Sequence, residues 1–138
     1  MLKSIADQYA FVAKLEVADI TASVTWYTTK LDLEVDTRYL GEPRWRQLNM
    51  PGVPRVALGL WQAKNPANSG GAVATFVVEN IAESRQQLIA RGVTVSPIQD
   101  VGQGVFLCFF KDPDGNGLGL RQSGNSEPKP KLLGSFAR

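Results

Sequence analysis

The sequence predicts an α+β fold built from two tandem βαβββ modules, and two observations support this prediction. The first is an internal repeat, because the motif Val17-Ala18-Asp19-Ile20, followed by Ser23, recurs as Val78-Glu79-Asn80-Ile81, followed by Ser84. The second is that each copy ends a strand-like run and begins a helix-like run, after which three more strand-like runs follow. A repeat of this kind indicates two modules of the same architecture.

The first module is expected over about residues 9–62. Residues 11–17 alternate between two faces, with Ala13, Leu15 and Val17 on one and Val12, Lys14 and Glu16 on the other. Asp19 has the position of a helix N-cap, and apolar residues at helical spacing follow it. Further strands are expected over 33–39, 44–49 and 55–61, separated by turns at Gly41-Glu42-Pro43 and Pro51-Gly52-Val53-Pro54.

The second module is expected over about residues 72–122. A strand over 72–78 leads to the cap Asn80 and to a helix that ends near Gly92. Strands over 93–98, 105–110 and 118–121 follow, with Asp112-Pro113-Asp114-Gly115-Asn116 as a turn. The linker over 63–71 is too short to separate independent domains, so residues 1–122 are expected to form a single domain. The Gly- and Pro-containing tail over 123–138 is expected to be poorly ordered.

The composition excludes several classes of protein. Of 138 residues, 43% are hydrophobic and 20% charged, which is typical of a folded chain, and the net charge of +2 gives no reason to expect a nucleic-acid partner. The longest apolar run, 105–110, is too short to cross a membrane, so we expect a cytoplasmic protein without membrane partners. The chain has no histidine, which removes Ser-His-Asp, Cys-His and His-containing zinc sites.

The repeat and its motifs resemble a known superfamily. The tandem βαβββ pattern, Asp19 with Ser23, the Trp26-Tyr27 pair and the run 109–116, which ends in the Asp-Pro-Asp-Gly-Asn turn, are similar to the vicinal oxygen chelate superfamily over about residues 9–122. This group is also called the glyoxalase, bleomycin-resistance and extradiol dioxygenase superfamily. The resemblance implies a curved mixed sheet that encloses a cavity, with the helices on its outer face.

The same resemblance predicts a protein without a metal cofactor. The family's metal enzymes place His or Glu at four equivalent positions, which fall here on Val12, Gly59, Val73 and Gly119. Val12 and Val73 are separated by the same offset as the two copies of the cap motif, and both glycines lie in Leu-Gly-Leu triplets, so the two modules agree. None of the four side chains can bind a cation. The two glycines either enlarge the cavity or are neutral relics of the fold.

Strand alternation predicts which side chains share the cavity surface with these four positions. Trp61 is the leading candidate, because an indole can stack on a flat ligand ring, although packing at a module or dimer seam also explains it. Trp26 and Tyr27 are assigned to helix packing, and Cys108 to the core as an inert thiol. Which phenylalanines of 105–110 face the cavity stays open. The predicted ligand-binding residues are Val12, Lys14, Glu16, Trp45, Gln47, Gly59, Trp61, Val73, Thr75, Gly119 and Arg121, with Asn49, Ala57, Val77 and Gly117 on the same faces.

These residues predict metal-independent binding or sequestration of a small aromatic organic molecule, similar to drug-binding resistance proteins and without turnover. The resemblance also implies a homodimer, with the modules either kept within one chain or exchanged between two. The alternative is a metal-independent isomerase or lyase acting on a carbonyl compound. In it, Glu16 would be the general base and Lys14 or Arg121 would stabilise an anion. A third hypothesis is a structural or regulatory protein with a vestigial cavity.

Overall fold

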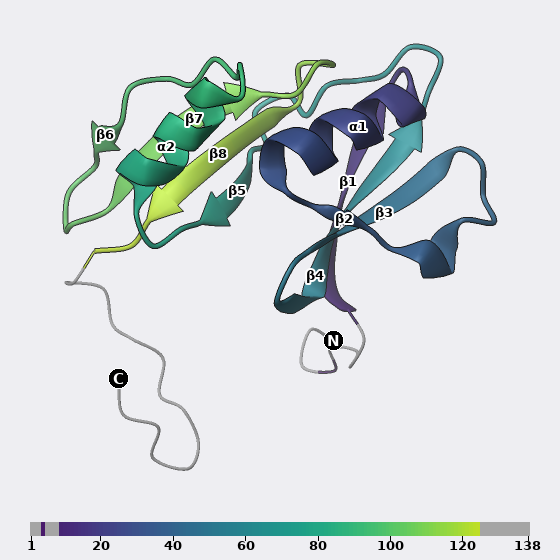
Figure 1. Ribbon diagram of the computed structural model, residues 1–138, viewed down its shortest axis with the longest axis horizontal. Coiled ribbons are helices and arrows are strands. Elements are labelled where there is room, and N and C mark those ends of the chain that lie inside the picture. The colour runs from purple at the N-terminus through teal and green to yellow at the C-terminus, as the bar shows by residue number, and fades with distance from the viewer. Residues whose placement is uncertain (1–3, 5–8, 125–138) are drawn as a thin grey trace.

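Two four-stranded sheets, each covered by one helix, make up the described part of the chain (Figure 1). The computed structural model describes residue 4 and residues 9–124. The strand orders are β1-β4-β3-β2 and β5-β8-β7-β6, and the first strand of each module runs parallel to its last. The predicted pair of βαβββ modules is therefore confirmed. The elements are β1 (Tyr9–Val17), α1 (Ile20–Leu31), β2 (Glu34–Val35), η1 (Thr37–Tyr39), β3 (Trp45–Met50), β4 (Val53–Gln62), β5 (Ala74–Val77), α2 (Ile81–Ala90), β6 (Gln99–Asp100), β7 (Phe106–Lys111) and β8 (Gly117–Gln122).

The repeated motif forms the same helix start in both modules. Asp19 caps α1 by accepting a hydrogen bond from the amide of Ala22 at 3.1 Å, and Asn80 caps α2 in the same way. The first residue of each helix also donates its backbone N–H, at 2.9 Å, to the side-chain oxygen of the last strand's glutamine, Gln62 or Gln122. These bonds fix each helix on its own sheet, and the glutamines are a second repeated feature that the sequence did not reveal.

Two predicted strands differ from the structure. The strand expected over 33–39 is reduced to β2, because Asp36 accepts the amide of Arg38 and starts the 3-10 turn η1 instead. The strand expected over 93–98 does not form, and β6 follows it at Gln99–Asp100. Pro97 has no N–H to donate to a ladder. In this segment, only Ser96 donates a backbone hydrogen bond to β7, at 2.8 Å to the carbonyl of Phe109.

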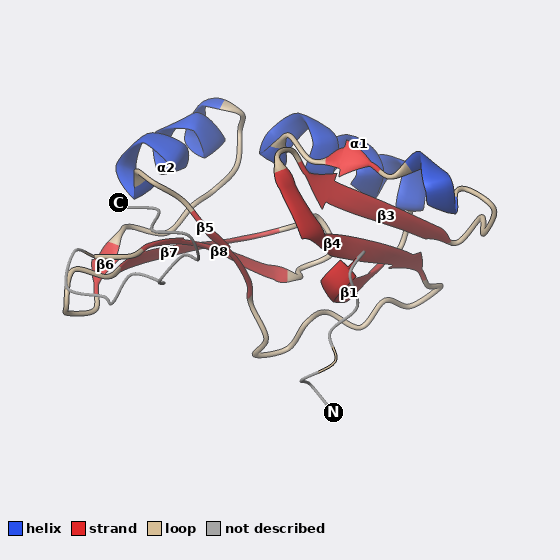
Figure 2. Cartoon of the chain, turned by 90° about the horizontal axis from the view of Figure 1, so that it is seen from below, coloured by secondary structure: helices blue, strands red, loops and turns tan. Residues whose placement is uncertain are grey.

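The hydrophobic core lies between the helices and one face of each sheet. Figure 2 shows both helices on the same side of the two sheets. The buried leucines of β4 and β8, such as Leu60 and Leu118, pack beneath the helices in one cluster that spans both modules. Cys108 and Phe110 belong to this cluster, which leaves Phe109 on the opposite face of β7. Burial raises the pKa of the Cys108 thiol, as expected for an inert core cysteine.

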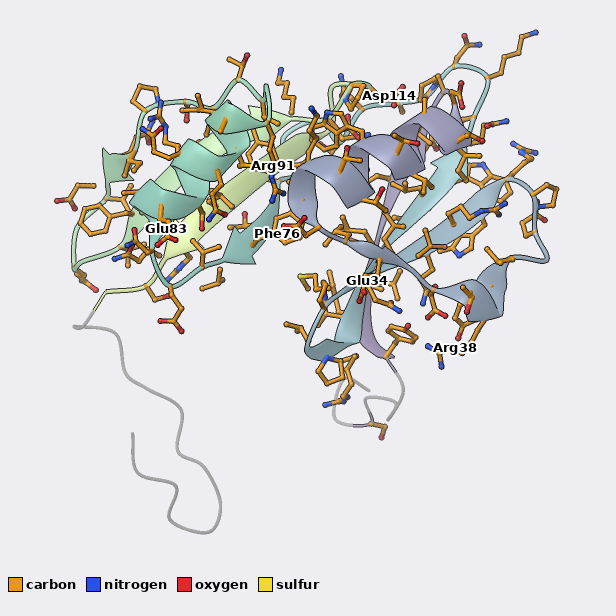
Figure 3. The ribbon with its side chains drawn as sticks, viewed as in Figure 1. Glu34, Arg38, Phe76, Glu83, Arg91 and Asp114 are labelled. Carbon is orange, nitrogen blue, oxygen red and sulfur yellow. The ribbon has the colours of Figure 1, made fainter. Side chains whose placement is uncertain are left out.

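The predicted turn 112–116 joins the two modules. Tyr27 of α1 is fully buried and donates its hydroxyl to the Asp112 carboxylate at 2.7 Å. Burial, together with this carboxylate, raises the pKa of Tyr27 far above its usual value. Asp114, beside α1 in Figure 3, accepts the amide of Ala18 at 3.0 Å, and Asn116 donates to the carbonyl of Glu16 at 3.0 Å. The turn of the second module is therefore anchored on the β1–α1 corner of the first.

Hydrogen bonds from described residues satisfy the Asp112 carboxylate. Its Oδ1 accepts the amides of Asp114 and Asn116, and its Oδ2 accepts the Asn116 side chain and the Tyr27 hydroxyl, all within 2.9 Å. Four donors match the four lone-pair positions of an ionised carboxylate. Burial of this charge at the joint is therefore compensated by hydrogen bonds.

No helix within residues 9–124 is long and apolar enough to cross a membrane. The tail that the sequence predicts to be poorly ordered lies mostly outside the described residues, because the description ends at Gly124.

Candidate functional site

Most of the predicted site residues of the first module lie on the face of its sheet that the helix leaves open. The core residues Leu15, Leu48 and Leu58 point towards α1, so their neighbours in each strand point the other way. The strand register places Gly59 between Lys14 and Gln47, and Trp61 between Glu16 and Trp45. We call this surface the first open face. Its residues are Val12, Lys14, Glu16, Trp45, Gln47, Asn49, Ala57, Gly59 and Trp61.

The indole of Trp45 covers Gly59. A Cβ atom built on Gly59 would lie 1.9 Å from Cη2 of Trp45 and 2.3 Å from Cζ2, so the ring occupies the space that a side chain would fill. Gly59 and its neighbour Gln47 are buried although they lie on the open face. Gly59 neither enlarges a cavity nor is a neutral relic, which were the two explanations the sequence left open. It allows close approach of an aromatic ring.

Trp61 lies next to Trp45 on the first open face. The guanidinium of Arg44 lies 4.4 Å from the centre of its ring, which is within the range of a cation–π contact. Arg44 is held there by a hydrogen bond from its Nε to the carbonyl of Gln62 at 3.2 Å. One face of the Trp61 indole is therefore occupied by an arginine from the same chain, which the sequence did not predict.

Glu16 has a structural partner. One carboxylate oxygen accepts the backbone amide of Ala67 in the linker at 2.9 Å, and the other lies 4.0 Å from the ammonium of Lys14. This arrangement fixes the linker against the end of β1. Glu16 and Lys14 do share a face, but half of the carboxylate that the alternative hypothesis uses as a base is engaged by the backbone.

The second module presents an equivalent surface, the second open face. Thr75 pairs with Gly119 and Val77 with Arg121 across β5 and β8, while Phe109 pairs with Gly119 from β7. A Cβ on Gly119 would lie 3.2 Å from Phe109 and from Val73, so this glycine is crowded but not covered. Phe109 is therefore a phenylalanine of β7 that lies on the open face, a question that the sequence left undecided. The residues of this face are Val73, Thr75, Val77, Phe109, Gly117, Gly119 and Arg121.

The structure brings the predicted residues together within each sheet. The two open faces meet only where β4 lies near β5, and we call this boundary the seam. A cavity of about 200 Å³ between β4 and β5 is lined by Ala57, Val73 and Thr75 together with apolar residues such as Phe11. Its lining contains neither Trp45 nor Trp61. A volume of this size is below the usual range of ligand pockets, about 300–1,000 Å³.

A polar cluster that the sequence did not predict lies at the far end of the first open face. Asp36 is buried and accepts hydrogen bonds from Arg38, from the Tyr9 hydroxyl at 2.5 Å and from Asn49 at 3.1 Å. The Arg38 guanidinium holds the pKa of Asp36 far below its usual range. Tyr9, Arg38, Asn49 and Arg55 also line a cavity of about 410 Å³. The visible signal was Asp36 directly before a short turn, which is typical of a capping residue.

The resemblance relates four positions of this chain to the metal ligands of other family members. Val12, Gly59, Val73 and Gly119 have no side-chain donor atoms, and the Trp45 ring occupies the volume in front of Gly59. Among the described residues, no group of three or more Cys, Asp or Glu side chains is arranged to hold a metal ion. Aromatic, aliphatic and amide groups therefore make up most of the two open faces, beside the charged side chains of Lys14, Glu16 and Arg121.

The family model described as the Glyoxalase/Bleomycin resistance protein/Dioxygenase superfamily matches residues 7–120. The chain belongs to this superfamily. The resemblance found in the sequence is thereby confirmed at the level of the family. Among curated proteins, no sequence matches the chain significantly.

Several solved structures share the fold of this chain. A member from Sphaerobacter thermophilus DSM 20745 aligns with a TM-score of 0.71 and 23% identity, covering 86% of this chain and 98% of its own. An integron cassette protein from the Halifax Harbour sewage outfall metagenome aligns with a TM-score of 0.67 and 25% identity, covering 81% and 96%. TnmS3, an antibiotic-binding protein from Streptomyces sp. CB03234, aligns with a TM-score of 0.68 and 23% identity, covering 82% and 93%.

Proposed function

We propose that this protein binds or sequesters a small aromatic organic molecule without a metal ion and without turnover. The observation that carries the proposal is the indole of Trp45 seated on Gly59, where a metal enzyme of the superfamily would place a ligand side chain. An indole ring in that position provides a large, rigid surface on which a flat ligand can stack. It has no charge with which to polarise a ligand bond. The fold neighbour TnmS3 is an antibiotic-binding protein, so planar antibiotics are the first compounds to test.

The proposed ligand lies against the two tryptophans of the first open face. Trp45 and Trp61 are directly paired across β3 and β4, and both are half-buried. Arg44 covers one side of Trp61 and supplies a positive charge next to the aromatic surface. Gln47, between these strands, adds an amide that can fix the orientation of a polar substituent.

The proposed binding unit is a homodimer. Phe11 is 65% exposed and Val77 67% exposed, and Val12 and Val73 are also exposed on the strands next to the seam. Exposed apolar side chains from both modules near one seam favour contact with a second copy of the chain. The seam cavity within one chain is too small for a drug-sized ligand, whereas a second copy laid over the open faces would enclose a larger volume. Val77→Glu should shift sedimentation-equilibrium mass towards the monomer, and unchanged mass would contradict the dimer.

Binding is tested with a panel of planar antibiotics and aromatic metabolites, with and without EDTA. A ligand at 100 times its Kd should stabilise the protein by about 2.7 kcal/mol, which a thermal melt detects. Trp45→Ala should abolish this stabilisation, whereas the control Leu40→Ala, which truncates an exposed apolar side chain outside the first open face, should retain it. A panel without any hit, or equal effects of both variants, would contradict the proposed site.

The same mixtures distinguish binding from catalysis. Each compound is recovered after incubation and analysed by chromatography, and the proposal expects it unchanged. Conversion that survives EDTA and is lost in Glu16→Gln would instead support the isomerase or lyase hypothesis. Conversion that is lost on adding EDTA would contradict the metal-independent proposal itself.

A further inference from the structure

The segment after α2 separates from β7 and leaves an opening in the second sheet. Ser96 pairs with Phe109 through its backbone N–H, at 2.8 Å, and through its Oγ, which accepts the Phe109 amide at 2.8 Å. Continuing this antiparallel register along both strands would place Thr94 opposite Lys111. No backbone hydrogen bond joins these two residues in the described chain. The ladder therefore ends at Ser96, although the sequence favours a strand from Val93 onwards.

A cavity of about 790 Å³ occupies this opening, and we call it the edge cavity. Aromatic residues from both modules line it, because Trp26 belongs to α1 and Phe109 and Phe110 belong to β7. The half-buried Trp26 ring is fixed by an edge contact with Tyr27, at 5.0 Å between ring centroids and 78° between planes. The volume lies within the range of small-molecule sites, about 300–1,000 Å³.

The polar groups of the edge cavity indicate the charge of its ligand. Lys111 is the one charged residue among the described residues of the lining, and it is exposed. Thr94 is also exposed, and its backbone N–H has no hydrogen-bond partner among the described residues, so it can donate to a ligand. An ammonium and an amide donor beside aromatic walls are complementary to a carboxylate attached to a flat ring.

From this arrangement we infer that the edge cavity is a binding site for a small aromatic carboxylate. The ring lies between Trp26 and Phe109, and the carboxylate accepts hydrogen bonds from Lys111 and from the Thr94 amide. This site is separate from the first open face and independent of the function proposed there, because its lining contains neither Trp45 nor Trp61. It shares Val73, Phe109 and Gly117 with the second open face.

The three tryptophans allow a direct test by NMR, because each indole N–H gives one resonance in a ¹⁵N-labelled protein. Single Trp→Phe variants assign the three signals. Titration with 2-naphthoate should shift the Trp26 indole and the Thr94 amide saturably. Lys111→Met should weaken this binding by about tenfold or more, as expected for loss of a charge-assisted hydrogen bond. The neutral isostere 2-naphthamide should bind Lys111→Met and the native protein equally.

Lys64→Met is the matched control, because Lys64 is an exposed linker lysine outside the cavity lining. It should leave the Kd of 2-naphthoate unchanged. An unmoved Trp26 signal, or equal Kd values for the two lysine variants, would overturn the inference. Shifts confined to Trp45 and Trp61 would overturn it while supporting the first open face as the binding site. Shifts confined to Trp26 and Thr94 would support the edge cavity and give no support to the proposed function.

Discussion

Replacing Gly59 with alanine would place a methyl group within the volume of the Trp45 ring. The new Cβ would lie 1.9 Å from Cη2 and 2.3 Å from Cζ2, whereas carbon atoms in contact are about 3.5–4.0 Å apart. The ring must leave its position, and overpacking of this kind costs about 1–3 kcal/mol. An unfolding entropy of about 2.1 cal/mol/K per residue gives about 0.29 kcal/mol/K for 138 residues, so Tm should fall by about 3–10 °C.

The assay combines thermal unfolding with tryptophan emission, because the displaced indole also becomes more exposed to water. Gly41→Ala is the matched control, since a Cβ there meets nothing within 4 Å and the backbone has no positive φ. In a Trp45→Ala background, Gly59→Ala should cost almost nothing, because the clashing ring is absent. If Gly59→Ala were as stable as Gly41→Ala, or if its cost persisted without Trp45, the packing of the indole on Gly59 would be refuted.

Three further substitutions test other contacts. Tyr27→Phe should lower the free energy of unfolding by about 1.5–3 kcal/mol in urea denaturation, because the buried Asp112 loses one of its four donors; an unchanged midpoint would show that the joint does not need this bond. Asp36→Asn should lower Tm at pH 7, where the carboxylate with its lowered pKa stabilises the fold. This difference should shrink as pH falls below about 4, because the Asp36 carboxyl of the unfolded chain then takes up a proton that the folded carboxylate does not. A pH-independent difference would exclude that cause. Glu16→Gln should retain ligand binding and differ little in Tm, since an amide oxygen still accepts the linker N–H; loss of binding would give Glu16 a direct role.

The order of the elements could be predicted because each module repeats its own local signals. Asp19 and Asn80 cap the two helices as the sequence indicated, and strand alternation correctly separated Leu15 from Lys14 and Glu16. These features depend on residues close together in the chain. The strand expected over 93–98 failed although its apolar alternation is real, because alternation reports which face is buried and not whether the backbone is hydrogen-bonded to a neighbouring strand. The pairing that would make it a strand depends on its distance from β7.

The candidate site was less predictable because its geometry depends on contacts between strands. Gly59 was recognised as unusual, but only the register shows that Trp45 lies close enough to cover it. Trp26 was assigned to helix packing, which is correct for its contact with Tyr27, yet the same ring lines the edge cavity. Residue type and spacing predict on which face of a strand a side chain lies. Which side chain fills the space in front of a given residue depends on the direction in which side chains on neighbouring strands point.

The joint between the modules has a consequence for how the two halves recognise each other. The offset between the two copies of the cap motif relates Tyr27 to Leu88 and Asp112 to Pro51, so each half carries only one partner of the Tyr27–Asp112 bond. A pair of first halves would lack the carboxylate that accepts this hydrogen bond, and a pair of second halves would lack the phenol that donates it. If the halves are expressed as separate polypeptides, they can form this contact only when one first half pairs with one second half. The protein is therefore suited to division into two complementing fragments.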